Sequence, residues 1–308
     1  MNDIVIETRN LTKYFGKTLA LDHLNLQVPR GCIYGLLGRN GAGKTTAIKL
    51  MLGLLRPTTG TATVLGCDCQ NLTPQIRQRI GYVTEGHRLY RWMKIGELAK
   101  FQQAFFPGSW DDKLFNDMLD YFELSKKQKI KTLSNGERAQ VSLAITLAPN
   151  PELLIMDDPT LGLDTAIRRQ FLEGMIQLIE RQGRTILFSS HILSDVERVA
   201  ERIAVIDRGV LRADCKLEEF RAAVKKVRFN FAEAVPGQVD IPGLLHSRQN
   251  EKELELTLIG TTVEQIDTWA KSAGATYHKD IDMNLEDQFI EFTAPDTNRS
   301  LFQWEEIK

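Results

Sequence analysis

The chain has 308 residues, 43% of them hydrophobic and 26% charged, which is typical of a globular protein with more than one domain. Its 39 Lys and Arg residues nearly balance 40 Asp and Glu residues, and a formal net charge of −1 provides no global basic field for a nucleic acid, so we expect no nucleic-acid partner. No apolar run approaches the roughly 18 residues of a membrane-spanning helix, and the segment after Met1 lacks the features of a signal peptide, so we expect a cytoplasmic location.

Apolar and polar residues alternate within the first 30 residues. Ile4 and Ile6, and then Leu24, Leu26 and Val28, occupy every second position. A period of two is typical of half-buried strands, so this region is predicted to form strands of an antiparallel layer.

The middle of the chain changes between strand and helix patterns. Residues 31–65 contain an apolar strand, a glycine-rich turn and a helix, and residues 85–150 show the apolar spacing of helices. Short apolar runs follow at residues 153–156, 186–188 and 203–206, separated by helix-sized intervals. These runs predict a parallel sheet that is covered by helices on both faces.

The pattern changes again beyond about residue 216. Residues 227–231 and 254–258 alternate as strands do, and a helical pattern follows at residues 263–273. We therefore predict a small α+β accessory domain, which begins at residue 221 and ends in a polar tail at residues 294–308.

A glycine-rich segment fits the pattern G-x-x-x-x-G-K-[ST]. It follows the apolar strand Ile33–Leu37 and opens a helix predicted at Thr46–Leu52, which is the context of a P-loop. Its backbone N–H groups and the start of the helix are suited to phosphate oxygens. Lys44 would reach the β- and γ-phosphates, and the Thr45 hydroxyl would coordinate Mg²⁺. The predicted ATP-binding residues of this segment are Gly38, Arg39, Asn40, Gly41, Ala42, Gly43, Lys44, Thr45 and Thr46.

Asp157 closes the apolar run at residues 153–156. An acid at this place holds Mg²⁺, directly or through water, in P-loop enzymes, although an acid after a buried strand can also be an ordinary helix cap. Together with the P-loop, Asp157 indicates a nucleoside triphosphatase. The predicted fold is a P-loop α/β core with an antiparallel β layer and a helical subdomain, and a small C-terminal α+β domain follows.

The predicted domains are residues 1–215, with the helical subdomain at about 85–150, and residues 221–308.

The segment Leu133–Glu137 lies about twenty residues before Asp157, at the start of a helix predicted at Arg138–Leu147. Here the chain resembles the ABC transporter ATPase family, whose signature usually reads Leu-Ser-Gly-Gly-Gln. Serine is a common helix N-cap, and a glycine leaves the backbone open to an anion, although such a helix end can also be merely capped. The residues that match the signature are Ser134, Asn135, Gly136 and Glu137.

Other elements of the family match in the same order, and the resemblance covers residues 4–215. Phe15 corresponds to the aromatic residue that stacks on adenine, with Tyr14 as the weaker candidate. Leu161–Asp164 resembles the D-loop, in which Asp164 is the acidic residue. His191 resembles the switch histidine that contacts the γ-phosphate.

The resemblance implies a mechanism and partners. Two ATPase domains would pair head to tail, as a homodimer or a heterodimer, and Ser134 and Gly136 would cap the nucleotide of the opposite subunit. MgATP would close the dimer and hydrolysis would open it. The motion would pass through residues 85–92 to an integral membrane permease, which would hold the chain at the inner face of the cell membrane.

Two residues depart from the family pattern. Glu85 stands where the Q-loop usually has Gln, and it still offers an oxygen towards Mg²⁺ or its water. Asp158 stands where the catalytic residue is usually Glu, and its shorter side chain withdraws the carboxylate by about 1.5 Å. Such a displacement can cost on the order of 10²-fold in rate. We expect Asp158, His191 and Glu85 to be catalytic, with slow turnover.

Three further segments resemble export ATPases of the ABC-2 type: Arg88–Met93, Phe188–Leu193 and the ending at Asn284–Thr293. Export of a drug, a peptide antibiotic or a lipid-like compound is therefore the leading hypothesis for the substrate. The accessory domain is interpreted either as a dimer-stabilising or as a regulatory element.

Two other classes of protein remain open at this stage. The chain could be a slow or inactive ATP-dependent regulatory subunit, because Asp158 replaces Glu. It could also be a soluble ABC-type ATPase that acts on ribosomes or DNA, although only one P-loop is present.

Overall fold

The computed structural model describes residues 3–294, except for the side chains of residues 175 and 177–182. The chain forms two compact units, Met1–Asp214 and Cys215–Lys308. The tail predicted at residues 294–308 lies outside the described residues apart from Ala294. Within residues 3–294, no helix combines the length and the apolar character needed to cross a membrane.

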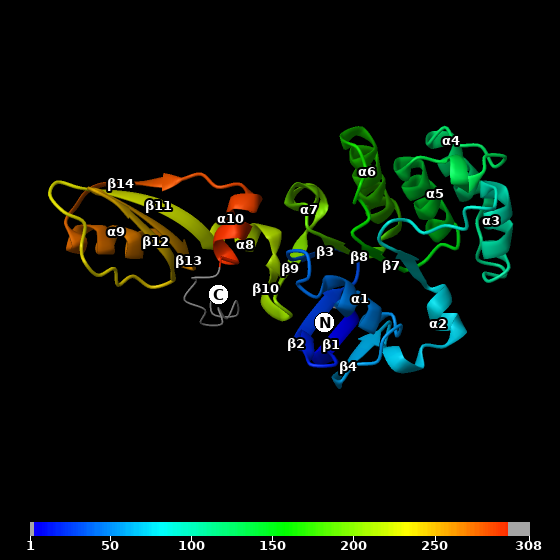
Figure 1. Ribbon diagram of the computed structural model, residues 1–308, viewed down its shortest axis with the longest axis horizontal. Helices are drawn as coiled ribbons and strands as arrows, with labels where there is room; N and C mark the ends of the chain where they lie inside the picture. The colour runs from blue at the N-terminus through cyan, green and yellow to red at the C-terminus, as the bar shows by residue number, and fades with distance from the viewer. Residues whose placement is uncertain (1–2, 295–308) are drawn as a thin grey trace. The chain divides into compact units, whose positions relative to one another are not determined.

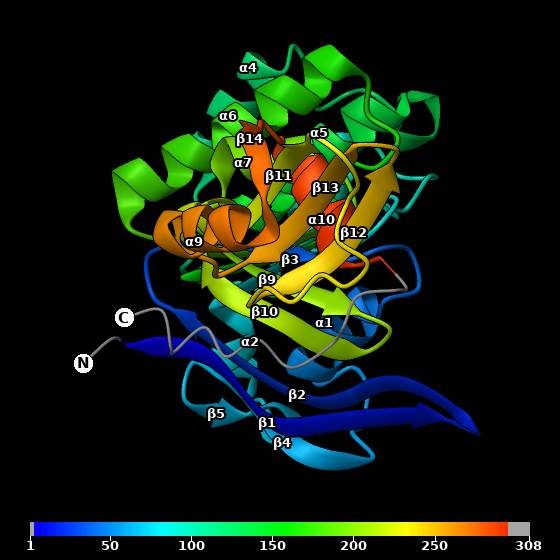
Figure 2. The same cartoon turned by 90° about the vertical axis from the view of Figure 1, so that its left-hand side faces the viewer.

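An antiparallel sheet forms the first layer of the N-terminal unit, at the bottom of Figure 2. Its strand order is β2-β1-β4-β5. The strands are β1 (Ile4–Phe15), β2 (Thr18–Pro29), β4 (Thr59–Val64) and β5 (Cys67–Asp68). Every second residue of β2 from Leu24 to Val28 is buried, so the alternation in the sequence is confirmed.

A six-stranded sheet forms the centre of the N-terminal unit, in the order β10-β9-β3-β8-β7-β6. The strands are β3 (Ile33–Leu37), β6 (Ile80–Val83), β7 (Leu153–Asp157), β8 (Thr185–Ser190), β9 (Arg202–Asp207) and β10 (Val210–Lys216). The strands from β9 to β6 are parallel, and every residue of β3, β7 and β8 is buried. The predicted parallel sheet is therefore confirmed.

The register of this sheet brings distant parts of the chain to one edge. Leu37, the last residue of β3, lies opposite Ser190, the last residue of β8. Asp157 at the end of β7 lies opposite Ser189. The loops that follow these strands therefore start at the same carboxyl edge, which is where open parallel sheets bind ligands.

Seven α-helices accompany the strands of the N-terminal unit in the described residues (Figure 1). They are α1 (Lys44–Met51), α2 (Pro74–Gln78), α3 (Ile95–Gln103), α4 (Asp112–Tyr121), α5 (Asn135–Leu147), α6 (Thr165–Gln182) and α7 (Leu193–Val199). Helices α3, α4 and α5 share a core that includes Leu98, Phe115 and Val141, within the region predicted to be helical. Two helices begin earlier than predicted: α1 starts directly after Gly43, whose φ of 112° ends the glycine-rich turn, and α5 starts directly after its N-cap Ser134.

The C-terminal unit contains an antiparallel sheet in the order β12-β13-β11-β14. Its elements are α8 (Leu217–Ala223), β11 (Val224–Phe231), β12 (Leu244–Asn250), β13 (Glu253–Ile259), α9 (Val263–Ala273), β14 (Ala275–Ile281) and α10 (Leu285–Phe292). Apolar side chains on one face of β11 and β13 form a core with α9, in which Phe229 meets the ring of Trp269 at a centroid distance of 4.9 Å.

Removing the Phe229 ring is expected to destabilise the C-terminal unit. Phe229 is fully buried, so Phe229→Ala should lower the free energy of unfolding by about 3–5 kcal/mol. Hydrogen exchange in β11 and β13 would measure this change. Tyr277→Ala is the control, because Tyr277 is 60% exposed and should change stability by no more than about 0.5 kcal/mol. Equal effects of the two substitutions would contradict the proposed core.

Candidate active site

A cavity of about 270 Å³ opens at the carboxyl edge of the central sheet. It is lined by Ala20, Asn40, Gly41, Ala42, Gly43, Lys44, Thr45, Thr46, Glu85 and Asp158. Two glycines of the same loop, Gly38 and Gly43, are required by the fold itself. A Cβ on Gly43, which has φ +112°, would lie 2.7 Å from the Ala20 carbonyl oxygen, and a Cβ on Gly38 would lie 2.5 Å from the Ile206 carbonyl oxygen. The loop therefore keeps its shape only without side chains at these positions.

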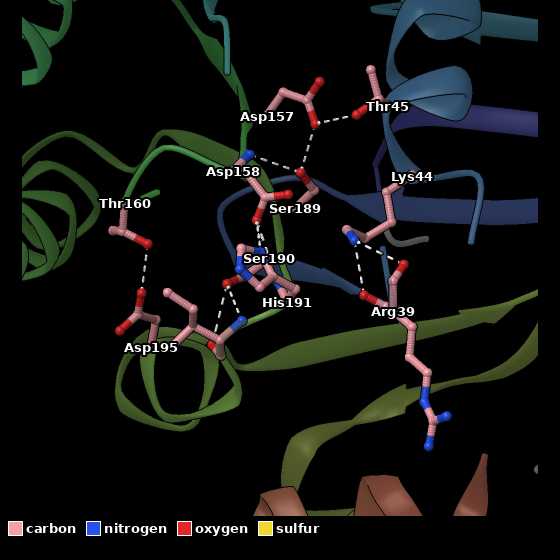
Figure 3. Close-up of polar contacts among 12 residues, drawn as sticks. Arg39, Lys44, Thr45, Asp157, Asp158, Thr160, Ser189, Ser190, His191 and Asp195 are labelled. Atoms are coloured by element: carbon pink, nitrogen blue, oxygen red, sulfur yellow. Dashed lines mark hydrogen bonds and ion pairs between the residues drawn. The ribbon is translucent and has the colours of Figure 1, made fainter. Parts of the chain in front are cut away.

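The Lys44 side chain lies inside this loop and is only 5% exposed. Its Nζ donates to the Gly38 carbonyl oxygen at 2.8 Å and to that of Arg39 at 3.4 Å (Figure 3). Burial lowers the Lys44 pKa, and the nearby carboxylates of Asp158, Asp157 and Glu85 oppose this shift. The loop therefore holds a buried ammonium group beside three acidic side chains.

Asp157 is buried at the centre of a hydrogen-bond network that joins the ends of β7 and β8 to the start of α1. The Thr45 hydroxyl donates to Asp157 Oδ1 at 3.0 Å, and the Ser189 hydroxyl donates to the same oxygen at 2.8 Å. The Asp158 backbone N–H donates to Ser189 Oγ at 2.9 Å. Asp157 is thus a partner of the P-loop (Figure 3), not the cap of the next helix, whose first turn is bound by Asp164 instead.

Asp158 and His191 are in direct contact. His191 Nδ1 lies 2.9 Å from Asp158 Oδ1, and the His191 backbone N–H donates to the same oxygen at 3.2 Å. Asp158 has a φ of +43°, in the left-handed region that costs energy for a residue with a side chain. The carboxylate therefore reaches its place through a strained turn at the end of β7.

Glu85 lines the cavity from the loop after β6, and its side chain is exposed. Phe15 is 48% exposed at the end of β1, and its ring centroid lies 5.2 Å from Lys13 Nζ. Neither Phe15 nor Tyr14 lines the cavity.

The residues that resemble the family signature lie away from the cavity of the same chain. Ser134 caps α5, and its backbone N–H bonds Glu137 Oε2 at 2.7 Å, so these two residues form a capping box. Gly136 packs against α6, because a Cβ there would lie 2.5 Å from Ile167 Cδ1. Asp164 accepts hydrogen bonds from the first turn of α6. The capped helix end that the sequence left open is therefore present, and Asn135 beside it is exposed.

Sequence reasoning assigned no role to three residues that make contacts at the turn Asp158–Thr160, namely Ser189, Thr160 and His87. The Ser189 hydroxyl bridges Asp157 and the Asp158 backbone, as described above. The Thr160 hydroxyl donates to Asp195 Oδ2 at 2.6 Å, and burial raises the Asp195 pKa while this hydrogen bond opposes the shift. The buried ring of His87 contacts the Pro159 carbonyl oxygen. The Ser-Ser pair at the end of a predicted strand, directly before His191, was the one signal available in the sequence.

Comparisons with known proteins identify the family of this chain. The family model described as ABC transporter matches residues 21–161. The daunorubicin/doxorubicin resistance ATP-binding protein DrrA of Streptomyces peucetius is 31% identical over 283 residues, which cover 90% of this chain and 78% of that protein. The probable multidrug ABC transporter ATP-binding protein YbhF of Escherichia coli is 35% identical over 224 residues, which cover 71% of this chain but only 38% of that protein.

A solved structure of the ATP-binding cassette MJ0796, a dimer bound to ADP and Pi after hydrolysis, matches with a TM-score of 0.62 and 25% sequence identity. The match covers 69% of this chain and 98% of that one. The predicted P-loop α/β fold is therefore confirmed. This chain belongs to the ABC transporter ATP-binding family, and its relatives include a probable multidrug transporter protein and a drug-resistance protein.

Because the Ser189 hydroxyl is part of the network around Asp157, we predict that its removal destabilises the folded chain. Ser189→Ala would leave the Asp158 N–H without its buried partner, so the free energy of unfolding should fall by about 1–3 kcal/mol. Chemical denaturation would measure the change. Ser125→Ala is the control, because Ser125 is exposed and its hydroxyl accepts one long hydrogen bond of 3.4 Å. A Ser189→Ala variant as stable as the Ser125→Ala variant would contradict the network.

Proposed function

We propose that this chain is the ATP-hydrolysing subunit of an ABC transporter that works as an exporter. The observation that carries the proposal is the convergence of three features at one cavity: the buried Lys44 ammonium group, the Thr45–Asp157 pair and the Asp158–His191 pair. A cationic loop, an oxygen-rich metal position and a carboxylate near the reacting atoms are the parts that phosphoryl transfer to water requires.

The residues at the cavity fit MgATP. The loop from Gly38 to Thr46 offers backbone N–H groups at the start of α1, and Lys44 can exchange its carbonyl partners for phosphate oxygens. Thr45, Asp157 and Glu85 would hold Mg²⁺ directly or through water, because this ion prefers oxygen ligands and keeps several of its waters. When bound, Mg²⁺ neutralises charge on the phosphates. Phe15 is exposed at the end of β1, and we assign it to the adenine ring.

Asp158 and His191 would carry out the chemistry. The Asp158 carboxylate accepts a hydrogen bond from the attacking water and orients it, while His191 contacts the phosphate that is transferred. In the structure the backbone N–H of His191 donates to one oxygen of Asp158, and the ring Nδ1 of His191 contacts the same oxygen. This contact leaves the second oxygen for water. It also restrains a side chain that is already one methylene shorter than the usual Glu, so turnover should be slow.

The exposed end of α5 would complete the site of a second ATPase subunit. Ser134 and Asn135 are exposed at the helix N-terminus, where the helix dipole favours an anion, and they do not line the cavity of their own chain. Ser134 to Glu137 and Asp164 would therefore act on the nucleotide of the opposite subunit in a homodimer or a heterodimer. MgATP would close this dimer and hydrolysis would open it.

The helical subdomain carries a surface suited to a membrane permease. Tyr90, Trp92, Phe101 and Phe105 are 40–73% exposed, and neighbouring rings in this group lie 5.2–6.3 Å apart. We call these four residues the aromatic cluster. Exposed aromatic side chains are enriched where proteins bind one another, and this cluster begins five residues after Glu85. A permease bound there would hold the chain at the inner face of the cell membrane and receive the motion of the Glu85 loop.

The hydrolysis proposal is tested by phosphate release from MgATP over a range of protein concentrations. A slow rate should rise more steeply than linearly with protein, and Lys44→Ala and Asp158→Asn should abolish it. Asp158→Glu should raise the rate, by up to about 10²-fold, because it restores the reach of the carboxylate. Tyr277→Ala, on β14 of the C-terminal unit, is the control. ATP-dependent dimerisation without turnover would instead favour a regulatory subunit.

The permease proposal is tested on the aromatic cluster. In membranes from cells that produce the chain, Trp92→Ala should lower the membrane-bound fraction at least tenfold, since a central aromatic residue of an interface often contributes about 2 kcal/mol. MgATP hydrolysis by the purified variant should not change. Tyr121→Ala is the matched control, because Tyr121 is 59% exposed in the same subdomain but outside the cluster. Equal losses for both variants would refute the assignment, and binding to ribosomes instead of membranes would favour a translation-associated ATPase.

A further inference from the structure

Three consecutive residues after Asp157 are each held by a residue that is distant in the sequence. Asp158 is bound by His191 in the loop after β8, Thr160 is bound by Asp195 on α7, and Pro159 is bound by His87. The first two contacts come from one segment, residues 191–195. His87 comes from a different segment, the loop after β6 that also carries Glu85.

His87 is almost completely buried, with an exposed fraction of 3%. Its Nε2 lies 2.9 Å from the Pro159 carbonyl oxygen. A carbonyl oxygen can only accept, so Nε2 carries the proton and donates it. Nδ1 is then an acceptor, and it is buried with no hydrogen-bond partner among the described residues. An imidazole buried with one nitrogen unsatisfied is costly for a purely packing role, which an apolar ring of similar size would fill better.

The backbone is strained at both ends of this hydrogen bond. His87 has a φ of +46° and directly follows Gly86, which has a φ of +72°. On the other side, Asp158 has a φ of +43° and directly precedes Pro159. Residues with side chains persist in this region only where surrounding contacts hold them, and such strain gathers at functional sites. The His87–Pro159 bond joins the two strained turns to each other.

We propose that His87 is a positioning residue for Asp158. Its hydrogen bond to Pro159 fixes the turn that presents the Asp158 carboxylate, and it ties this turn to the loop of Glu85, so that both carboxylates line the same cavity. A displacement of the Glu85 loop is then passed to Asp158 through a single hydrogen bond. This inference rests on the proposed function, because it assigns His87 a part in the hydrolysis of MgATP.

Three substitutions in the full chain separate positioning from packing. His87→Phe keeps a buried ring and removes the donor, while His87→Gln keeps an N–H donor at a similar reach. His246→Phe is the matched control, because His246 Nε2 lies 2.7 Å from the Glu291 carbonyl oxygen in the C-terminal unit and makes the same kind of bond. Thermal unfolding and equilibrium binding of MgATP would show that each variant is folded and still binds its nucleotide.

The expected result is a change in kcat without a matching change in KM. His87→Phe should lower kcat about tenfold or more, with KM for MgATP within about twofold of the wild type, because the nucleotide is held by the P-loop while the carboxylate is displaced. His87→Gln should recover most of the lost rate, and His246→Phe should match the wild type. Recovery of kcat in the His87→Gln variant would indicate positioning, because a mere loss of packing would not be repaired by the Gln donor.

Two other outcomes would overturn the inference, and they differ from a failure of the proposed function. If His87→Phe keeps the wild-type kcat, or if Gln and Phe lower kcat equally, His87 does not position Asp158, although hydrolysis itself stands. If the wild-type chain shows no MgATP hydrolysis, the proposed function fails first and the role of His87 fails with it.

Discussion

The register of the parallel strands at the carboxyl edge of the central sheet sets the geometry of the candidate site. Asp157 lies opposite Ser189, and the Ser189 hydroxyl bridges the Asp157 carboxylate and the Asp158 backbone. Through the Thr45 hydroxyl, the same carboxylate is joined to the start of α1. A slip of one residue between β7 and β8 would turn Asp157 to the other face of the sheet and separate these groups. The chemistry proposed for the cavity therefore depends on hydrophobic strands that are buried along their whole length.

The turn after β7 connects the rigid central sheet to the Asp158 carboxylate, which lines the cavity. Asp158 leaves the strand through a left-handed backbone conformation, and the turn is held by contacts of His191 with Asp158 and of His87 with Pro159. Strain of this kind is retained only when the surroundings over-determine it. The short Asp158 side chain makes this constraint more important, because a carboxylate with less reach depends more on where its backbone lies.

The P-loop and Asp157 could be predicted from the sequence because their requirements are local. A glycine with φ +112° and an acid that ends a buried strand leave a recognisable pattern within a few residues. Helix starts were less well predicted, since α1 and α5 begin as soon as a glycine or a serine cap permits. The contacts of His87 with Pro159 and of Thr160 with Asp195 join positions 72 and 35 residues apart. They could not be predicted from spacing, because they depend on which loops meet above the sheet.

Gly136 has two possible reasons to be a glycine, namely the packing of α5 against α6 and the proposed binding of an anion. Within this chain any side chain there would displace Ile167, so the close approach of α5 to α6 already excludes larger residues. A glycine at this position therefore does not by itself reveal an anion-binding role, and its replacement would disturb the helix pair and any bound phosphate together. Ser134, exposed on the same helix end, also has two roles, because its hydroxyl accepts a hydrogen bond from the Glu137 backbone N–H as the cap of α5, besides the role proposed for it at the nucleotide of an opposite subunit.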